Sequence, residues 1–147
     1  MIYKEEICDL FLVSEDYYLA HCISADFGMG KGIVVEFNKR FDMKSILQQK
    51  YPDYINIWHH KRIIGDCILE GRVLNLVTKE RYWNKPTYET LTAALLKMKQ
   101  LCITYDIKKV AMPTIGCGLD RLEWQKVSDC LKELFKDTEI EILVCIK

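Results

Sequence analysis

Two periods of apolar and polar positions run along this chain and divide it into expected strands and helices. Six short stretches are rich in strand-forming residues: 2–7, 17–23, 63–69, 72–78, 108–113 and 139–146. The two central stretches flank Glu70-Gly71, which predicts adjacent strands joined by a tight turn. Apolar residues at helical spacing predict helices over 33–41, 45–51, 87–102 and 123–136.

The helix over 87–102 has the clearest pattern. Its apolar residues repeat three or four positions apart: Leu91, Leu95, Met98 and Cys102. Thr87 stands where a helix cap is needed, and Glu89 suits the positive N-terminal end. Strands and helices alternate through the second half of the chain, which favours an α/β fold whose sheet is covered on both faces. Because the sequence has no repeat or linker, we expect one domain over residues 1–147.

Composition narrows the classes of protein. Half of the 147 residues are apolar, enough to form a hydrophobic core that is stable without disulfide bonds or structural metal ions. The 21 basic and 21 acidic residues balance, so the broad positive field of nonspecific nucleic-acid binders is missing. Seven cysteines without a C-x-x-C pair are typical of reduced intracellular thiols, and with no signal-like start or membrane-length apolar run we expect a cytoplasmic protein that binds no membrane.

Two glycine loops are candidates for ligand binding. GMGKG (28–32) precedes a predicted helix, and GCGLD (116–120) follows the strand that ends at Pro113. Ligands of α/β sheets lie beyond the carboxyl ends of strands, and two facing glycine loops would suit a diphosphate. Considered alone, each loop is more often a plain turn than a ligand site. Neither matches a P-loop or the GxGxxG fingerprint, since Lys31 is followed by Gly32.

Four segments together resemble a macrodomain, and within that family the terminal ADP-ribose protein glycohydrolase. They are CDLF (8–11), LAHCISADFGMGKGI (19–33), LVTKERYWNKPTYETL (76–91) and PTIGCGLDRLEW (113–124). The most specific parts are the T-K before K-P-T-Y-E and the P-x-I-G-C-G-L-D-R-L loop. The resemblance covers nearly the whole chain. It implies a three-layer α/β/α sandwich with a central mixed sheet and a pocket for ADP-ribose.

The resemblance also implies which residues contact ADP-ribose. Asp9 would receive the adenine amino group, Ser24 would line the distal ribose, and the glycine loops would clasp the diphosphate and distal ribose. The full set is Asp9, Leu10, Ser24, Gly30, Gly32, Ile33, Thr78, Pro113, Thr114, Ile115, Gly116, Cys117, Gly118 and Leu119. Two positions depart from the family pattern: Cys8 replaces the usual glycine, and Thr114 stands where relatives can have a larger or charged residue. From the residue type alone, Ser24 could equally bond to its own loop.

By the same resemblance, Lys79 is the nucleophile that attacks C1 of the distal ribose, and Asp120 resolves the lysyl–ADP-ribose that forms. An amine suits this step because it condenses with a masked aldehyde. A lysine is protonated near pH 7, so Asp120 is the expected base, with proton transfer in the occupied pocket. Considered alone, Lys79 would be a solvated strand-end lysine, and Asp120 could cap the next helix.

Other candidate groups fit structural roles better than chemical ones. Cys117 has no neighbouring histidine in sequence, so a buried thiol is favoured over a nucleophile. His21 lies in a strand and His59-His60 in an expected polar connector, and none has a partner at ligand spacing. We therefore expect neither a metal nor a cofactor. Tyr82-Trp83 could form the rim of a pocket or pack over an edge.

The resemblance predicts a hydrolase that removes mono-ADP-ribose from acidic side chains and accepts O-acyl-ADP-ribose. The alternatives are a reader module that binds ADP-ribose without cleaving it and a hydrolase of ADP-ribosylated DNA bases. The expected partners are ADP-ribose and ADP-ribosylated proteins, with ADP-ribosylated nucleic acid under the second alternative. A monomer is expected.

Overall fold

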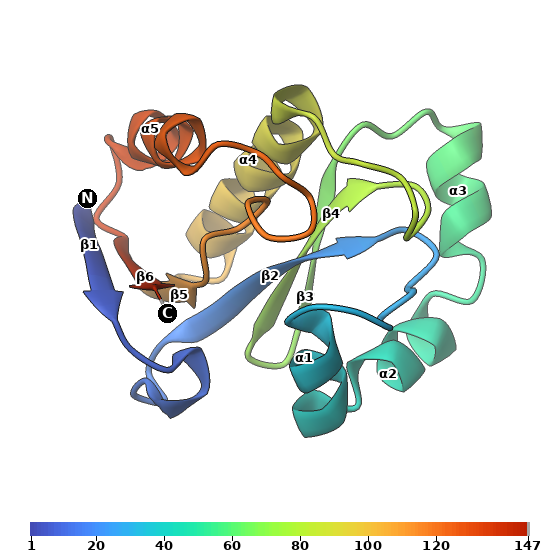
Figure 1. Cartoon of the computed structure of the whole chain (residues 1–147), viewed down its shortest axis with the longest axis horizontal. Coiled ribbons are helices and arrows are strands. Elements are labelled where there is room, and N and C mark those ends of the chain that lie inside the picture. The colour runs from blue at the N-terminus through green and yellow to red at the C-terminus, as the bar shows by residue number, and fades with distance from the viewer. Residues whose placement is uncertain (147) are drawn as a thin grey trace.

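A six-stranded mixed sheet forms the centre of the molecule (Figure 1). The computed structural model describes residues 1–146. The strands are β1 (Ile2–Ile7), β2 (Tyr18–Ser24), β3 (Asp66–Glu70), β4 (Val73–Lys79), β5 (Lys109–Met112) and β6 (Glu141–Ile146). Their order is β1-β6-β5-β2-β4-β3, and neighbours run parallel except β3, which is antiparallel to β4. The predicted mixed sheet is confirmed, including the strand pair joined at Glu70-Gly71.

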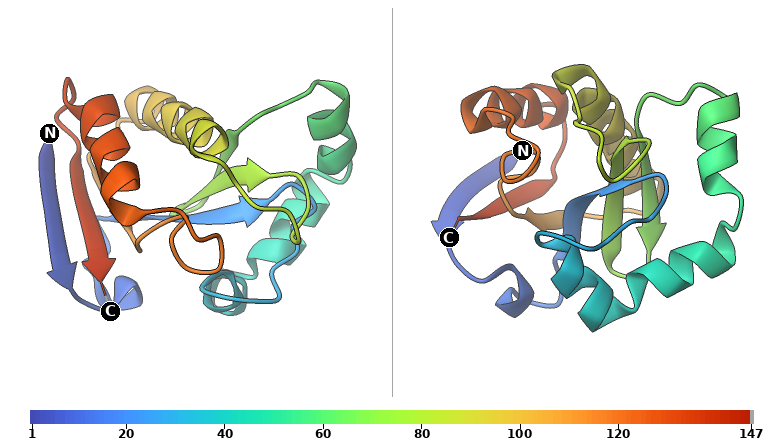
Figure 2. Two further views of the ribbon diagram at one scale, coloured as in Figure 1. Left: turned by 45° about the horizontal axis from the view of Figure 1, so that its top comes forward. Right: turned by 45° about the vertical axis from the view of Figure 1, so that its right-hand side comes forward.

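Helices cover both faces of the sheet (Figure 2). They are α1 (Val34–Phe41), α2 (Met43–Lys50), α3 (Tyr54–His60), α4 (Tyr88–Thr104) and α5 (Trp124–Phe135). One core joins α4 and α5 to the sheet, and the other joins α1, α2 and α3 to its opposite face. Residues of β4 alternate between the two: Leu74 and Leu76 pack in the first, Val73 and Val77 in the second. The predicted three-layer sandwich is therefore confirmed.

The N-terminus of α4 has the expected cap. The Thr87 hydroxyl accepts a hydrogen bond from the Thr90 N–H at 3.1 Å. In return the Thr90 hydroxyl accepts one from the Thr87 N–H at 2.9 Å. This reciprocal pair satisfies two backbone donors that a helix start would otherwise leave unpaired.

Two features of the middle of the chain differ from the sequence prediction. His59 and His60 lie at the end of helix α3, not in a polar connector. This helix has only seven residues, so its buried Tyr54 and Trp58 provide a single helical repeat, too little for a periodic signal. β3 begins at Asp66 and not at residue 63, because Gly65 packs against α4: a Cβ on it would lie 2.3 Å from the Thr90 carbonyl oxygen.

Parallel strands bring their carboxyl ends to one edge of the sheet. β2 lies between β5 and β4. The last residues of β2 and β4, Ser24 and Lys79, therefore lie at the same edge as Pro113, where the loop after β5 begins. β1 ends on that edge too, but β6 and β5 separate it from β2. Within residues 1–146, no helix is long and apolar enough to cross a membrane.

Candidate active site

Lys79 and Asp120 meet at this edge of the sheet. Lys79 is the last residue of β4 and Asp120 lies in the loop after β5, yet the Lys79 Nζ donates a hydrogen bond to the Asp120 Oδ1 at 2.9 Å. Each side chain is 15% exposed, so Lys79 is not a freely solvated lysine. Asp120 does not cap the next helix, since α5 begins at Trp124 after Glu123. The structure thus pairs an amine and a carboxylate in a largely desolvated position.

The two glycine loops face each other beside this pair. A Cβ on Gly32 would lie 3.5 Å from the Leu119 Cδ1, so the first loop reaches the second. Lys85 Nζ donates to the Leu119 carbonyl at 2.8 Å and connects the segment after β4 to the second loop. Tyr82 packs against Gly28, where a Cβ would lie 2.9 Å from the tyrosine Cβ. Three loops from different parts of the chain therefore contact one another beside Lys79 and Asp120.

Tyr82 and Trp83 are on the rim of this arrangement. They are 63% and 62% exposed, with ring centroids 5.0 Å apart in an edge-to-face arrangement. The sequence left open whether these rings form the rim of a pocket or pack over an edge. Their exposure agrees with a position on the rim. Their exposed ring faces are free to contact a molecule outside the chain.

The glycines differ in their demands on the backbone. Gly32 and Gly116 have φ values of +78° and +76°, which favour glycine. Gly30 and Gly118 lie outside the left-handed region, and among the described residues no atom beyond the two chain neighbours comes within 4 Å of a Cβ built on either glycine. The fold itself does not require glycine at these two positions.

The remaining loop residues that the resemblance assigned to ADP-ribose lie around the same edge. Ile33, Pro113, Thr114 and Cys117 are half-buried, Ile115 and Gly116 are buried, and Leu119 is exposed. The Cys117 Sγ donates to the Ile115 carbonyl at 3.4 Å, and burial raises the pKa of this thiol. A protonated, hydrogen-bonded thiol agrees with a structural role.

The end of β2 adds a carboxylate that the sequence did not single out. Ser24 is the Cα partner of Lys79 across the β2–β4 pairing, at a shift in register. Its hydroxyl donates to the Asp26 carboxylate, as a serine bonded to its own loop would. An aspartate two residues before a glycine is a turn-forming pattern, and this pattern was the available signal for Asp26.

Cys22 and Thr78 lie near the Lys79–Asp120 pair. Cys22 is half-buried, and desolvation, together with the nearby Asp120 carboxylate, raises the pKa of its thiol to about 12, so the thiol is neutral. Thr78, at the end of β4, is 1% exposed, and its Oγ1 has no hydrogen-bond partner within residues 1–146. A buried hydroxyl without a hydrogen-bond partner is unusual in a folded protein.

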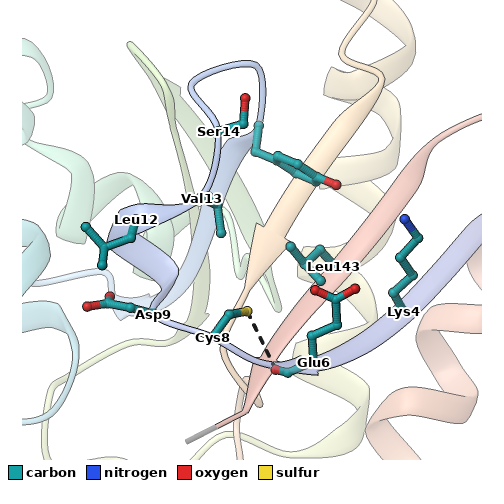
Figure 3. Close-up of a pocket in the computed structure, with 9 residues that line it drawn as sticks. Lys4, Glu6, Cys8, Asp9, Leu12, Val13, Ser14 and Leu143 are labelled. Carbon is teal, nitrogen blue, oxygen red and sulfur yellow. Dashed lines mark hydrogen bonds between the residues drawn. The ribbon is translucent and has the colours of Figure 1, made fainter.

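Asp9 and Leu10 lie away from the Lys79–Asp120 pair. Asp9 is exposed and accepts a hydrogen bond from the Phe11 N–H at 2.9 Å, which caps the 3₁₀ helix η1 (Leu10–Leu12), while Leu10 is buried in the second core. Asp9 borders a hollow of about 340 Å³, shown in Figure 3. The lining residues are Lys4, Glu6, Cys8, Asp9, Leu12, Val13, Ser14, Tyr17 and Leu143.

Cys8 needs no glycine-like backbone. Within residues 1–146, the non-glycine residues with positive φ are Phe27, Asp42, Arg62, Asp106 and Arg121. The Cys8 Sγ instead donates to the Cys145 Sγ at 2.8 Å, on neighbouring strand β6. The departure from the family glycine therefore adds a side-chain contact without left-handed backbone strain.

The three histidines are dispersed over the fold. His21 is fully buried, stacks on Phe37 and lies 2.6 Å from the Asn75 Oδ1 through its Nε2. His59 Nδ1 lies 2.8 Å from the Glu80 Oε1 at the surface. In the part of the chain that the structure describes, no three His, Cys, Asp or Glu side chains gather as a metal site would require.

Comparison with known proteins identifies the family. The family model described as Macro domain matches residues 70–131. The human ADP-ribose glycohydrolase OARD1 is 42% identical over 139 residues, which cover 92% of this chain and 86% of that protein. The DNA ADP-ribosyl glycohydrolase of Mycobacterium tuberculosis is 27% identical over 112 residues, 74% of this chain and 32% of that protein.

Solved structures agree on the fold. The macrodomain of Mycobacterium tuberculosis DarG superposes with a TM-score of 0.79 over 98% of this chain and 97% of that chain, at 19% identity. Thermosipho africanus DarTG in complex with ADP-ribose has a TM-score of 0.70 over 95% of this chain and 40% of that chain, at 19% identity. From the 42% identity over most of both chains, this chain belongs to the macrodomain family and, within it, resembles the terminal ADP-ribose protein glycohydrolases.

Proposed function

We propose that this chain removes mono-ADP-ribose from acidic side chains of proteins, and from O-acyl-ADP-ribose, through a covalent intermediate on Lys79. The observation that carries the proposal is the hydrogen bond of 2.9 Å between the Lys79 Nζ and the Asp120 Oδ1, both side chains being 15% exposed. The 42% identity to an enzyme named ADP-ribose glycohydrolase supports hydrolysis over simple binding. A reader module has no need of this pair.

The chemistry requires one base and one nucleophile. Asp120 accepts a proton from the Lys79 ammonium, and the free amine forms a bond to C1 of the distal ribose. The bond from C1 to the ester oxygen breaks, and Asp120 gives its proton to that oxygen, so the modified side chain leaves as a carboxylic acid and Asp120 is a carboxylate again. Water then attacks C1 while Asp120 takes a proton from it. The bond from C1 to the Lys79 nitrogen breaks, ADP-ribose is released, and Asp120 returns the proton to the Lys79 amine.

Two features of the surrounding loops support a bound diphosphate and ribose. Neither packing nor backbone conformation requires glycine at positions 30 and 118, and close approach of a ligand to the backbone would explain why glycine is present there. Their loops touch at Gly32 and Leu119 beside the Lys79–Asp120 pair.

Release of ADP-ribose from DNA bases is the second candidate. It is favoured by the 27% identity to an enzyme named DNA ADP-ribosyl glycohydrolase and by the exposed rings of Tyr82 and Trp83, on which bases can stack. The balance of 21 basic and 21 acidic residues favours a protein substrate, or a single flipped base, over a long duplex.

A cytoplasmic location and a monomeric state stay predictions.

Substitution of Lys79 tests the reaction. Lys79→Ala should lower turnover of carboxyl-linked ADP-ribosylated protein by at least about a thousandfold and keep ADP-ribose affinity within about threefold, because the amine acts in the reaction more than in binding. Lys97→Ala, which removes an exposed lysine of α4, is the matched control and should act like wild type. Mass spectrometry of wild type quenched during turnover should find ADP-ribose on Lys79.

The outcomes separate the candidates. A wild-type protein that binds ADP-ribose and releases no label, even with enzyme in excess, would be a reader. Faster release from ADP-ribosylated single-stranded DNA than from protein at equal enzyme would favour the second candidate. Equal loss of binding and turnover in Lys79→Ala would contradict the role of the amine.

A further inference from the structure

Asp26 lies just beyond β2, and its carboxylate accepts three hydrogen bonds. Oδ1 accepts from the Ser24 hydroxyl and, at 3.0 Å, from the Gly28 N–H. Oδ2 accepts from the Tyr82 N–H at 3.1 Å. An ionised carboxylate can only accept, so each of its three partners must be the donor. The side chain therefore joins the end of β2, the first glycine loop and the segment after Lys79.

The backbone holds this turn against the proposed nucleophile. The Ala25 N–H donates to the Lys79 carbonyl at 2.9 Å, and the Asp26 N–H donates to the Glu80 carbonyl at 3.1 Å. Ser24 is the strand partner of Lys79. Bonds to backbone groups on both sides thus orient the Asp26 carboxylate, and it cannot turn away from Ser24 without breaking them.

This arrangement determines which kind of ligand group Ser24 can bind. A hydroxyl has one proton, and Ser24 gives it to Asp26. The Ser24 oxygen then has only lone pairs to offer. A sugar hydroxyl can donate to it, whereas a phosphate oxygen cannot. Ser24 is 1% exposed, so a ribose hydroxyl reaches its oxygen only when the groups that cover it move aside.

We propose that Asp26 is a positioning residue that keeps the Ser24 hydroxyl as an acceptor for a hydroxyl group of the ribose at Lys79. The inference rests on the proposed function, which puts that ribose next to Lys79. It adds a residue that acts through Ser24 and selects a ribose hydroxyl at this position. ADP, which has no distal ribose, should be insensitive to Asp26.

The test compares ADP-ribose with ADP in calorimetric titrations. Asp26→Asn places an amide NH₂ where a carboxylate oxygen faces a donor, and Ser24→Ala removes the acceptor. Each variant should lower affinity for ADP-ribose about tenfold and leave affinity for ADP within about twofold. The double variant should lose no more than the larger single loss, because Asp26 acts through Ser24.

Kinetics and a control complete the design. Asp26→Asn should lower kcat, and Asp129→Asn, which changes an exposed carboxylate on α5, should bind both ligands like wild type. Equal losses for ADP and ADP-ribose, or additive losses in the double variant, would show that Asp26 only supports the loop and would overturn the proposal. If Asp26→Asn is too unstable to purify, an unchanged ADP-ribose to ADP ratio in Ser24→Ala overturns it.

The proposed function fails separately. It fails if wild type neither binds ADP-ribose nor cleaves ADP-ribosylated protein. If wild type does both and Asp26→Asn matches it, only the inference about Asp26 is wrong.

Discussion

Alanine at the two glycines of the GCG loop should separate folding from ligand binding. Gly116 has φ +76°, and a Cβ there would lie 3.0 Å from the Leu122 Cδ1. The left-handed region costs other residues about 1–2 kcal/mol, and the close leucine contact adds to this cost. Gly118 has neither constraint among the described residues, so alanine there should change the free energy of unfolding by less than about 1 kcal/mol.

Urea unfolding and calorimetry measure the two effects. Gly116→Ala should lower the free energy of unfolding by about 2 kcal/mol, which for a domain of this size lowers Tm by about 4–8 °C. Gly118→Ala should unfold like wild type but bind ADP-ribose at least about tenfold more weakly, because the methyl group occupies the space that the ligand needs. Equal destabilisation by both substitutions, or wild-type affinity in Gly118→Ala, would refute the reasoning.

Three further predictions follow from the same structure. Asp120→Asn removes the base and keeps an acceptor for Lys79, so turnover should fall at least about a hundredfold with ADP-ribose binding retained, and wild-type turnover would contradict its role. Burial lowers the pKa of His21 to about 4 from 6.5, so the unfolded chain binds the extra proton between these values. The free energy of unfolding should therefore fall by up to about 3 kcal/mol as pH drops from 6.5 to 4. Chemical denaturation at several pH values measures this fall, and the His21→Gln variant should not show it. Burial raises the pKa of Cys145 to about 12, so iodoacetamide at pH 8 should modify this thiol far more slowly in the folded protein than in urea. Peptide mass spectrometry can follow the modification, and equal rates would argue against burial.

The sequence pattern predicted elements that are long or that have a clear local signal. α4 combines five buried positions at helical spacing with a capping threonine, and both features are visible within seventeen residues. The strand pair around Gly71 is likewise local. α3 was missed because seven residues contain a single repeat, and the start of β3 was misplaced because packing of Gly65 on α4, not propensity, determines it.

The residues of the candidate site likewise fall into those that the sequence identified and those that only the structure revealed. Its glycine loops and the segments that resemble the family are continuous in sequence, so Lys79, Asp120 and both loops could be named from residues alone. Asp26 was not named from residues alone, because one of the hydrogen bonds that orient its carboxylate comes from the Tyr82 N–H, 56 positions away along the chain. The contact of Lys85 with the Leu119 carbonyl is equally nonlocal.

Periodicity and residue types along the chain were enough for the α/β class, for the two glycine loops and for the kinds of group that could react. Their spatial relations came from the fold. The sheet order β1-β6-β5-β2-β4-β3 brings the ends of β4 and β5 to opposite sides of β2 and separates Asp9 from both. Strand order and register depend on packing between residues far apart in the chain, and a shift of one residue at Ser24 changes what faces Lys79. For that reason the Lys79–Asp120 hydrogen bond and the orientation of the Asp26 carboxylate toward Ser24 exist only in the folded chain.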